Sequence, residues 1–372
     1  MDTHVRVQAK IETAARAGSD LVTMWREIGP LLAEAVPHFE APCFFTVDPA
    51  SFLTTSHFQE GLPEIPAEWL GREYAEGDYN SMTDVLTSPG GVGTLHEATG
   101  NRPELSTKFH EEMEPFGCDQ ELLVALRTRD KQTWGMVGLY RESGRPMFSD
   151  DEIAVLLAMS PALAEGARQG LLLGQAREPD LPEAPGVVVL DGSFAVESLT
   201  PNAAYWLEDL GGSPDALPRT IVALAGQALG DAGPRVARMR GASGRWVVAH
   251  GARLAGPQAA RRVSVIIEAA ESAYLAPLLM RAHGLTSREQ DVTRVMLRGA
   301  STTAAAKDLA ISEGTIQQHL KSIFKKTGVR SRGELVSTIF HTHYEPRVRD
   351  NERRTLTARA SRHGPMPTQK TL

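Results

Sequence analysis

The spacing of apolar residues along this chain of 372 residues is helical at first, then alternating, and helical again near the end. Between residues 21 and 36 apolar residues recur every three or four positions, which predicts an amphipathic helix ending near Pro37. Two short β-prone runs follow, Cys43–Val47 and Phe52–Phe58, with a turn at residues 48–50 between them.

The stretch from residue 61 to 100 is rich in Gly, Pro and acidic residues, which predicts short helices mixed with loops. Within it, residues 90–94 (GGVGT) lack the Lys-Ser/Thr of a phosphate-binding loop, and no clear strand precedes them, so we expect a flexible loop. Glu121–Arg129 and Gln132–Arg141 flank a charged turn and predict a hairpin. Ser149 or Asp150 then caps a long helix with an apolar stripe.

Arg177–Glu183 is polar and contains proline, which predicts a linker. A new series of strand-like and helical runs begins after it. Two strand-like runs, two helical runs and three further strand-like runs follow. In chain order they are Val187–Asp191, Ala195–Leu199, Asn202–Leu210, Thr220–Leu229, Arg235–Arg240, Arg245–Leu254 and Arg262–Glu268.

Residues 271–283 predict a connecting helix, and we expect Pro277 near its first turn because proline lacks the N–H that a helix interior needs. Residues 284–340 then predict four short helices, three of them with start signals. Thr286 and Glu289 have the spacing of a capping box, as do Ser331 and Glu334. Ser312 is a favourable N-cap for the helix between them.

The helix that follows Ser312 has two contrasting faces. Ile316, Leu320, Ile323 and Phe324 form one apolar stripe at helical spacing. The opposite face carries the amide and basic side chains of Gln317, Gln318, Lys321 and Lys325. Glutamine can pair with adenine and lysine can reach guanine or phosphate, so such a face after a tight turn is what reading of the DNA major groove requires. An ordinary helical bundle with a solvated polar face is the alternative.

These residues resemble the LuxR-type helix-turn-helix domain of bacterial transcription regulators. The likeness runs without a gap from Leu285-Thr286-x-Arg288-Glu289 through Thr315-Ile316 and His319-Leu320 to Glu334-Leu335-Val336. Two positions depart from the family pattern: Ala304 stands where the family usually has Glu, and Gln317 where it often has Lys. The second departure lies on the reading face and therefore concerns the target sequence.

The resemblance implies roles for particular residues. It assigns base reading to Gln317, Gln318 and Lys321. It assigns phosphate contacts to Thr315, Lys325, Lys326 and Arg332. Family members dimerise through the last helix, where apolar residues at 335, 336, 339 and 340 exceed the needs of one small bundle. We therefore expect Val336 and Phe340 at a homodimer interface; the alternative is that all four residues are internal core.

Charge is unevenly distributed along the chain. Residues 1–280 contain 22 Lys and Arg against 38 Asp and Glu, and residues 281–372 contain 17 against 8. The overall net charge of −7 therefore hides a basic C-terminal quarter, where a nucleic-acid surface is expected. Residues 345–372 are basic and nearly free of large apolar residues, which predicts a disordered tail that either contacts phosphates or is merely solvated.

The N-terminal part resembles two kinds of sensor domain. A helix, an antiparallel sheet and a closing helix are similar to a GAF domain, and two strands, short helices and three strands are similar to a PAS domain. The expected fold is thus α+β and multidomain, with a C-terminal all-α domain. The expected segments are 1–175 (GAF-like, with N-terminal helices), 176–184 (linker), 185–270 (PAS-like), 271–283 (connection), 284–344 (helix-turn-helix) and 345–372 (tail). The GAF-like domain either holds a small ligand or only mediates dimerisation.

Several other functions lack a supporting pattern in the sequence. No stretch is long and apolar enough to span a membrane, and no secretory signal is present, so a cytoplasmic protein is expected. Cys43 and Cys118 make no metal motif, and an inert buried thiol is favoured over redox sensing. We expect no metal, no cofactor and no catalysis. Double-stranded DNA is the expected partner and RNA polymerase a candidate one. An enzyme with a DNA-binding appendage and an adaptor acting only through protein contacts are the alternatives.

Overall fold

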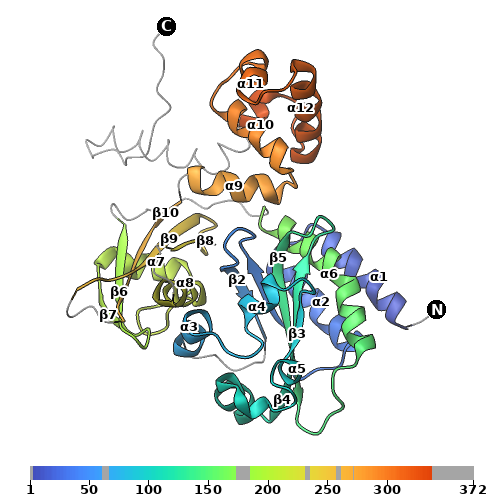
Figure 1. Ribbon diagram of the computed structural model, residues 1–372, viewed down its shortest axis with the longest axis vertical. Coiled ribbons are helices and arrows are strands. Elements are labelled where there is room, and N and C mark those ends of the chain that lie inside the picture. Colours follow the sequence, from blue (N-terminus) through green and yellow to red (C-terminus); the bar gives the residue numbers. More distant parts are fainter. Residues whose placement is uncertain are drawn as a thin grey trace. The chain divides into compact units, whose positions relative to one another are not determined.

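A computed structural model describes residues 3–60, 67–172, 185–230, 235–256, 261–270 and 272–336. The chain forms two compact units (Figure 1). The first comprises Met1–Gly174 and Ala184–Glu268, and the second comprises Gln175–Glu183 and Ala269–Leu372. The fold is mixed α/β, with two antiparallel sheets in the first unit and a helical domain in the second, as the sequence predicts.

The first half of the first unit contains one five-stranded sheet of order β2-β1-β5-β4-β3. Its elements are α1 (Thr3–Arg16), α2 (Leu21–Ala35), β1 (Cys43–Val47), β2 (Thr54–Phe58), α3 (Ala67–Ala75), α4 (Met82–Thr87), β3 (Val92–Thr94), α5 (Leu95–Ala98), β4 (Cys118–Arg127), β5 (Thr133–Glu142) and α6 (Asp150–Gly170). Three short 3₁₀ or π-helical turns lie at Pro103–Leu105, Phe109–Met113 and Glu114–Phe116.

Apolar side chains cover both faces of this sheet. On one face lie α1, α2 and α6, and the Trp25 ring of α2 stacks on Phe44 of β1 with ring centroids 4.2 Å apart (Figure 1). On the other, Cys43, Phe45 and Val47 of β1 pack with α4. Because both faces are covered, all five residues of β1 are buried, including the polar Thr46, whose hydroxyl lies 2.7 Å from that of Thr55.

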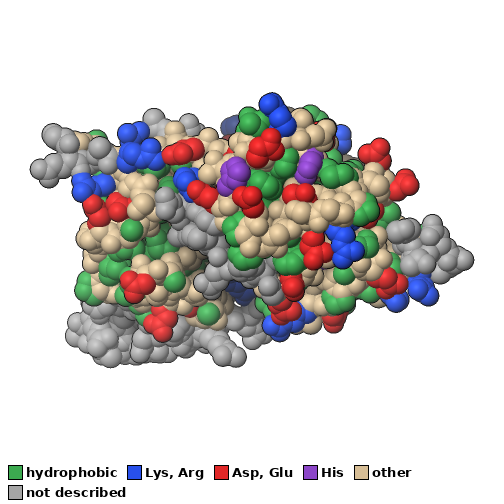
Figure 2. All heavy atoms as spheres, turned by 90° about the horizontal axis from the view of Figure 1, so that it is seen from below, with side chains coloured by type: hydrophobic (Ala, Val, Ile, Leu, Met, Phe, Trp, Pro, Cys, Tyr) green, Lys and Arg blue, Asp and Glu red, His purple; other side chains and the backbone are tan. Residues whose placement is uncertain are grey.

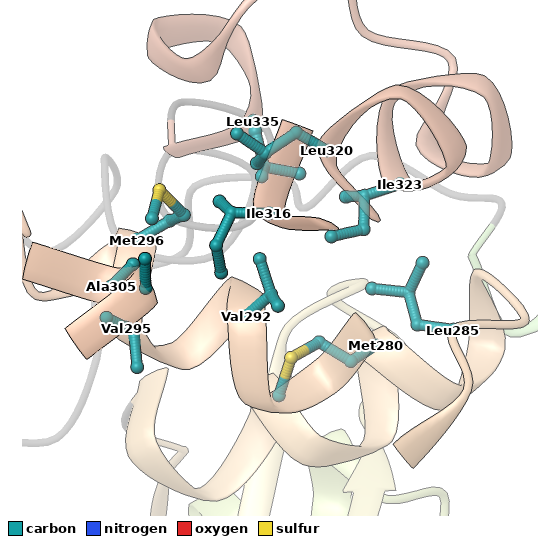
Figure 3. Close-up of a cluster of buried hydrophobic side chains, with 11 residues drawn as sticks. Met280, Leu285, Val292, Val295, Met296, Ala305, Ile316, Leu320, Ile323 and Leu335 are labelled. Atoms are coloured by element: carbon teal, nitrogen blue, oxygen red, sulfur yellow. The ribbon is translucent and has the colours of Figure 1, made fainter. Parts of the chain in front are cut away.

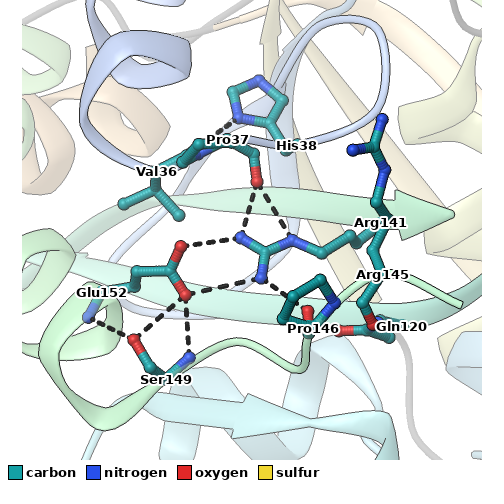
Figure 4. Close-up of polar contacts among 9 residues, drawn as sticks. All are labelled: Val36, Pro37, His38, Gln120, Arg141, Arg145, Pro146, Ser149 and Glu152. Atoms are coloured by element: carbon teal, nitrogen blue, oxygen red, sulfur yellow. Dashed lines mark hydrogen bonds and ion pairs between the residues drawn. The ribbon is translucent and has the colours of Figure 1, made fainter.

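Arg141 of β5 connects the end of α2 to the start of α6 (Figure 4). Its guanidinium donates to the Pro37 carbonyl at 2.6 Å and forms an ion pair with Glu152 at 2.9 Å. Glu152 in turn completes the capping box of Ser149, so Ser149, and not Asp150, is the N-cap of α6. These contacts hold the end of α2 and the start of α6 near the C-terminal end of β5, the central strand of the sheet.

The second half of the first unit repeats the strand order of the first. Its elements are β6 (Gly186–Leu190), β7 (Val196–Leu199), α7 (Pro201–Asp209), α8 (Arg219–Gly230), β8 (Arg235–Arg240), β9 (Trp246–Arg253) and β10 (Val263–Ala269). The sheet order is β7-β6-β10-β9-β8. If the strands of each half are numbered from one in chain order, both sheets have the order 2-1-5-4-3.

Close packing of α3 on α8 joins the two halves into one unit. A Cβ at Gly226 of α8 would lie 2.3 Å from the carbonyl oxygen of Gly71 in α3, so the two backbones meet where neither helix has a side chain. Asp48, which is 1% exposed, forms an ion pair with Arg238 of β8. A residue with a side chain at position 226 would separate the helices.

The second unit is a bundle of short helices: α9 (Ser272–Ala282), α10 (Ser287–Leu297), α11 (Thr302–Asp308), α12 (Glu313–Thr327) and a helical stretch at residues 332–336. Its core is drawn in Figure 3. The buried members are Met280, Leu285, Val292, Val295, Met296, Ala305, Ala306, Ile316, Leu320, Ile323 and Leu335.

Two local expectations are wrong. Pro277 is the sixth residue of α9 and lies inside the helix instead of its first turn; the packing of Met280 into the core holds this helix despite the missing N–H. Val92–Thr94, expected in a flexible loop, forms β3 and pairs with Leu122–Val124 of β4. The backbone hydrogen bonds of an edge strand outweigh the weak β propensity of glycine there.

Some expectations fall outside the described residues. They are the linker at 176–184, the tail at 345–372 and the last helix beyond residue 336, which includes Phe340. Among the residues that are described, no helix is long and apolar enough to cross a bilayer. Within the same residues, no cluster of three or more His, Cys, Asp or Glu has the arrangement of a metal site.

Candidate nucleic-acid interface

A tight turn sets α12 against α11. Ser301 caps α11 by accepting the Ala304 N–H at 3.1 Å, although it was not predicted as a helix start. The turn is closed by the Ile311 N–H on the Ala306 carbonyl at 3.0 Å, with Ala310 in the left-handed region at φ +52°. Ser312 then caps α12, as predicted, by accepting the Thr315 N–H at 3.1 Å.

The two faces of α12 have the burial that the pattern predicts. Ile316, Leu320 and Ile323 are at most 6% exposed and enter the core in Figure 3. Gln317, Gln318 and Lys321 are all exposed on the opposite face, and the three residues lie within about one turn of the helix. The structure therefore brings the three residues assigned to base reading together on one surface.

The residues assigned to phosphate contacts have different surroundings. Lys325 is exposed and follows Lys321 by one turn of α12. Thr315 is half-buried, and its hydroxyl lies 2.8 Å from that of Ser312. Arg332 is half-buried and donates to the Met296 carbonyl at 3.5 Å, a weak hydrogen bond. The Lys326 ammonium lies 2.7 Å from a carboxylate oxygen of Glu289.

Glu289 has a second role that its capping-box spacing does not reveal. Its side chain is 5% exposed and accepts hydrogen bonds from the Thr286 N–H at 2.7 Å, from Ser322 at 2.6 Å and from Lys326 at 2.7 Å. Burial raises the pKa of this carboxyl, but the hydrogen bonds from Lys326, Ser322 and Thr286 outweigh it and hold the pKa at about 2. The carboxylate thus ties α10 to the C-terminal half of α12.

The start of the last helix differs slightly from the predicted capping box. Ser331 accepts the Glu334 N–H at 3.1 Å, as expected. The Glu334 carboxylate, however, accepts the N–H of Arg330 at 2.7 Å, one residue before the N-cap. Leu335 is fully buried and Val336 is half-buried, so only the second retains surface for another molecule.

The net charge of the helical unit is the last feature of this candidate interface. Residues 272–336 contain ten Lys and Arg against five Asp and Glu. The face drawn in Figure 2, by contrast, shows acidic and basic side chains interspersed among apolar and neutral ones. A surplus of positive charge on the unit that exposes α12 favours association with a polyanion.

The short helices, the tight turn and the exposed polar face of α12 define a helix-turn-helix domain. The family described as "Bacterial regulatory proteins, luxR family" matches residues 283–339. A stretch of 52 residues is 35% identical to the spore germination protein GerE of Bacillus subtilis and covers 14% of this chain and 70% of that protein. The chain belongs to the LuxR family of bacterial regulatory proteins.

Two longer relatives match over the same domain alone. The monoamine regulon transcriptional regulator of Klebsiella aerogenes is 43% identical over 53 residues, which cover 14% of this chain and 23% of that protein. The CsgBAC operon transcriptional regulatory protein of Escherichia coli is 42% identical over 53 residues, 14% of this chain and 24% of that protein. The chain thus spans about a quarter of the length of these relatives.

Two solved structures are similar to this chain with low TM-scores. A Vibrio cholera VqmA–ligand–DNA complex is 15% identical with a TM-score of 0.22, over 45% of this chain and 85% of that one. The sensor region of a sensor histidine kinase is 13% identical with a TM-score of 0.20, over 72% of this chain and 93% of that one. Scores this low do not establish a common fold.

Proposed function

We propose that this protein is a sequence-specific transcriptional regulator whose α12 enters the DNA major groove. One observation carries the proposal: Gln317, Gln318 and Lys321 are exposed together on the face of α12 that is opposite its buried stripe. Each of these side chains can reach a base edge, since Gln pairs with adenine through two hydrogen bonds and Lys reaches guanine acceptors. Two of the relatives reported above are named as transcriptional regulators.

Phosphate contacts would position the domain on the duplex. Lys325 is exposed and can reach the DNA backbone. Thr315 lies in the first turn of α12, and Arg332 follows the end of this helix by five residues. Lys326 would have to share its ammonium between Glu289 and a phosphate oxygen. An ammonium has three donors, so both contacts are compatible.

A homodimer is the second part of the proposal. Two recognition helices related by a two-fold axis would read an inverted repeat. Val336 is half-buried beside the fully buried Leu335, which supports Val336 as an interface residue. Phe340, the other proposed interface residue, follows it by four positions along the sequence.

The first unit would act as the sensor. We propose a GAF-like domain within residues 1–175 and a PAS-like domain at 185–270, with the helix-turn-helix domain at 284–344. The repeated strand order of the two sheets and the flanking helices support this division. The GAF-like domain would hold a small ligand or mediate dimerisation. A DNA-binding regulator would act in the cytoplasm, with RNA polymerase as a candidate partner.

Selection and footprinting of fragments of the source genome test this function. The full-length protein should enrich a limited set of fragments that share an inverted repeat. A variant with Gln317, Gln318 and Lys321 all changed to Ala should keep its helical content and lose the enrichment, because the exposed face contributes little to folding. Enrichment of no sequence by the wild type would favour the adaptor that acts through protein contacts alone.

A further inference from the structure

A pocket of about 850 Å³ lies where β2 approaches the start of α8 in the first unit. Both halves of the unit contribute to it: residues of β2 and α3 come from the first, and residues of α8 and β8 from the second. Its volume lies within the range of small-molecule sites, which is roughly 300–1,000 Å³.

The lining divides into an apolar wall and a polar end. Leu70, Leu217, Val222 and Met239 supply apolar surface from four different segments. The polar lining residues include Thr55, Ser56, His57, Gln59, Arg219 and Arg240. Asp215 is the acidic residue among those that line the pocket, and it is exposed.

Arg219 is the distinctive residue of the polar end. Its Nη1 atom is buried and has no hydrogen-bond partner among the described residues. A buried cationic donor left without an acceptor costs more free energy than a neutral one, so an arginine in this state marks a place for an anion.

Besides the exposed Asp215, three titratable side chains feel the charge of Arg219: His57, Cys43 and Glu112. Burial and the nearby Arg219 charge lower the pKa of His57 to about 3, so this ring is neutral. Burial raises the pKa of Cys43 to about 12, and the thiol, 3.3 Å from His57, is also neutral. Burial raises the pKa of Glu112 to about 8 against the opposing charges of Lys108 and Arg219, which favours the neutral form of this carboxyl.

We propose that this pocket binds a small amphipathic monocarboxylate, an aromatic or aliphatic carboxylic acid, whose carboxylate pairs with Arg219. A guanidinium matches a carboxylate through two parallel hydrogen bonds. The apolar body of the ligand lies against Leu217, Val222 and Met239. A phosphate dianion fits less well, because no lysine lines the pocket and Asp215 would repel it. This inference rests on the sensor role proposed above and gives that sensor a ligand class.

Calorimetric titration of the full-length protein tests the proposal. Benzoate and hexanoate are the probes, benzyl alcohol and inorganic phosphate are the comparators, and ionic strength is held constant with NaCl. Benzoate or hexanoate should bind one per chain. Benzyl alcohol, which lacks the charge, and phosphate should bind at least about tenfold more weakly.

Two variants and a control locate the binding. Arg219→Gln should weaken carboxylate binding by about tenfold or more. Arg219→Lys keeps the positive charge but cannot donate two parallel hydrogen bonds, and it should weaken binding by less. Arg129→Gln, an exposed arginine that is not among the pocket residues, should leave binding unchanged. If Arg219→Gln alters the circular dichroism spectrum, Arg219→Lys and the benzyl alcohol comparison decide the outcome.

Several results would overturn the inference: no binding by either carboxylate, equal binding by Arg219→Gln, or phosphate binding as tight as benzoate. Binding of a selected genomic fragment is measured on the same preparations. Failure of carboxylate binding with DNA binding intact removes this inference alone, whereas absence of DNA binding in the wild type removes the proposed function.

Discussion

Two adjacent lysines on α12 have different environments. Lys325 is exposed, whereas the Lys326 ammonium pairs with the buried carboxylate of Glu289. Lys321, one turn before Lys325, lies with the two glutamines proposed to read bases. We therefore propose three different contributions: base reading for Lys321, phosphate attraction for Lys325 and stabilisation of the domain for Lys326.

Replacing Lys321 or Lys325 should have different consequences for DNA recognition. Lys321→Ala should cost about 1–3 kcal/mol of binding free energy and relax preference at one base position. Lys325→Ala should weaken binding to all sequences alike and lower the salt slope by about 1. Binding to a panel of single-base operator variants at several salt concentrations measures both effects. Identical specificity profiles for the two variants would contradict this division.

Lys326→Ala should lower both DNA affinity and the stability of the helical domain. Removing the ammonium takes one of the hydrogen bonds from the buried Glu289 carboxylate, which should cost about 1–2 kcal/mol of unfolding free energy. Lys325→Ala is the matched control and should leave the unfolding free energy within about 0.5 kcal/mol of the wild type. Urea denaturation of the three proteins provides the comparison. Equal stabilities would show that the ion pair contributes nothing.

Glu289 makes the stability of the helical domain depend on acid pH. Its folded-state pKa of about 2 lies below the unfolded value of roughly 4.3. Its contribution is therefore complete above about pH 5 and is lost as pH falls toward 2. Glu289→Gln should be less stable at pH 7, by about 2 kcal/mol, and the gap from the wild type should close between pH 5 and pH 2. A gap that stays constant over this range would argue against the charged contact.

At the scale of the element, α12 combines a buried stripe with an exposed face. Its N-cap at Ser312 and its C-terminal Gly328, at φ +71°, fix where the helix begins and ends. Ile316 is fully buried and Gln317, the next residue, is exposed. Ile316 therefore packs in the core of the domain, whereas Gln317 faces the solvent.

Ile316→Ala and Gln317→Ala should separate folding from recognition within this one helix. The first should destabilise the helical domain by about 2–5 kcal/mol, because it leaves a cavity among Val292, Met296 and Leu320. The second should change stability by less than about 0.5 kcal/mol and alter operator preference. Thermal unfolding and operator binding should be measured for both. A Gln317→Ala variant that unfolded as readily as Ile316→Ala would refute the assignment of the two faces.

The complete chain combines a two-sheet unit with a helical bundle of the LuxR family. The two sheets share a strand order, and α3 meets α8 at Gly71 and Gly226. A regulator of this kind acts on inverted repeats only if two copies present α12 to successive major grooves. The surface near residue 336 is where we propose that two copies meet.

Val336→Glu tests that proposal. A charged side chain at a half-buried apolar interface should prevent dimer formation, since an unpaired carboxylate would lose its hydration there. Binding to an operator with two half-sites should fall, while weak binding to one half-site should remain. Circular dichroism must first show intact helical content. Lys307→Glu, at an exposed residue of α11, serves as the charge control. Unchanged dimeric binding by Val336→Glu would remove Val336 from the interface.

Features that depend on residues close together in the chain could be predicted from the sequence. The Thr286 and Ser312 caps, the two faces of α12 and the hairpin of β4 and β5 follow from side-chain types at short, regular spacing, which local backbone geometry alone converts into structure. The LuxR family motif is of the same kind, because it is a continuous run of 57 residues.

Contacts between residues far apart in the chain could not be predicted and are visible only in the folded protein. Glu289 meets Lys326 across 37 positions, Gly71 meets Gly226, and Arg219 enters a pocket with residues of β2. No periodicity marks such pairs, because the partners come together only when whole helices and sheets pack. Pro277 within α9 is a further example of tertiary packing. Proline disfavours a helix interior, but the packing of Met280 of the same helix into the core outweighs this preference.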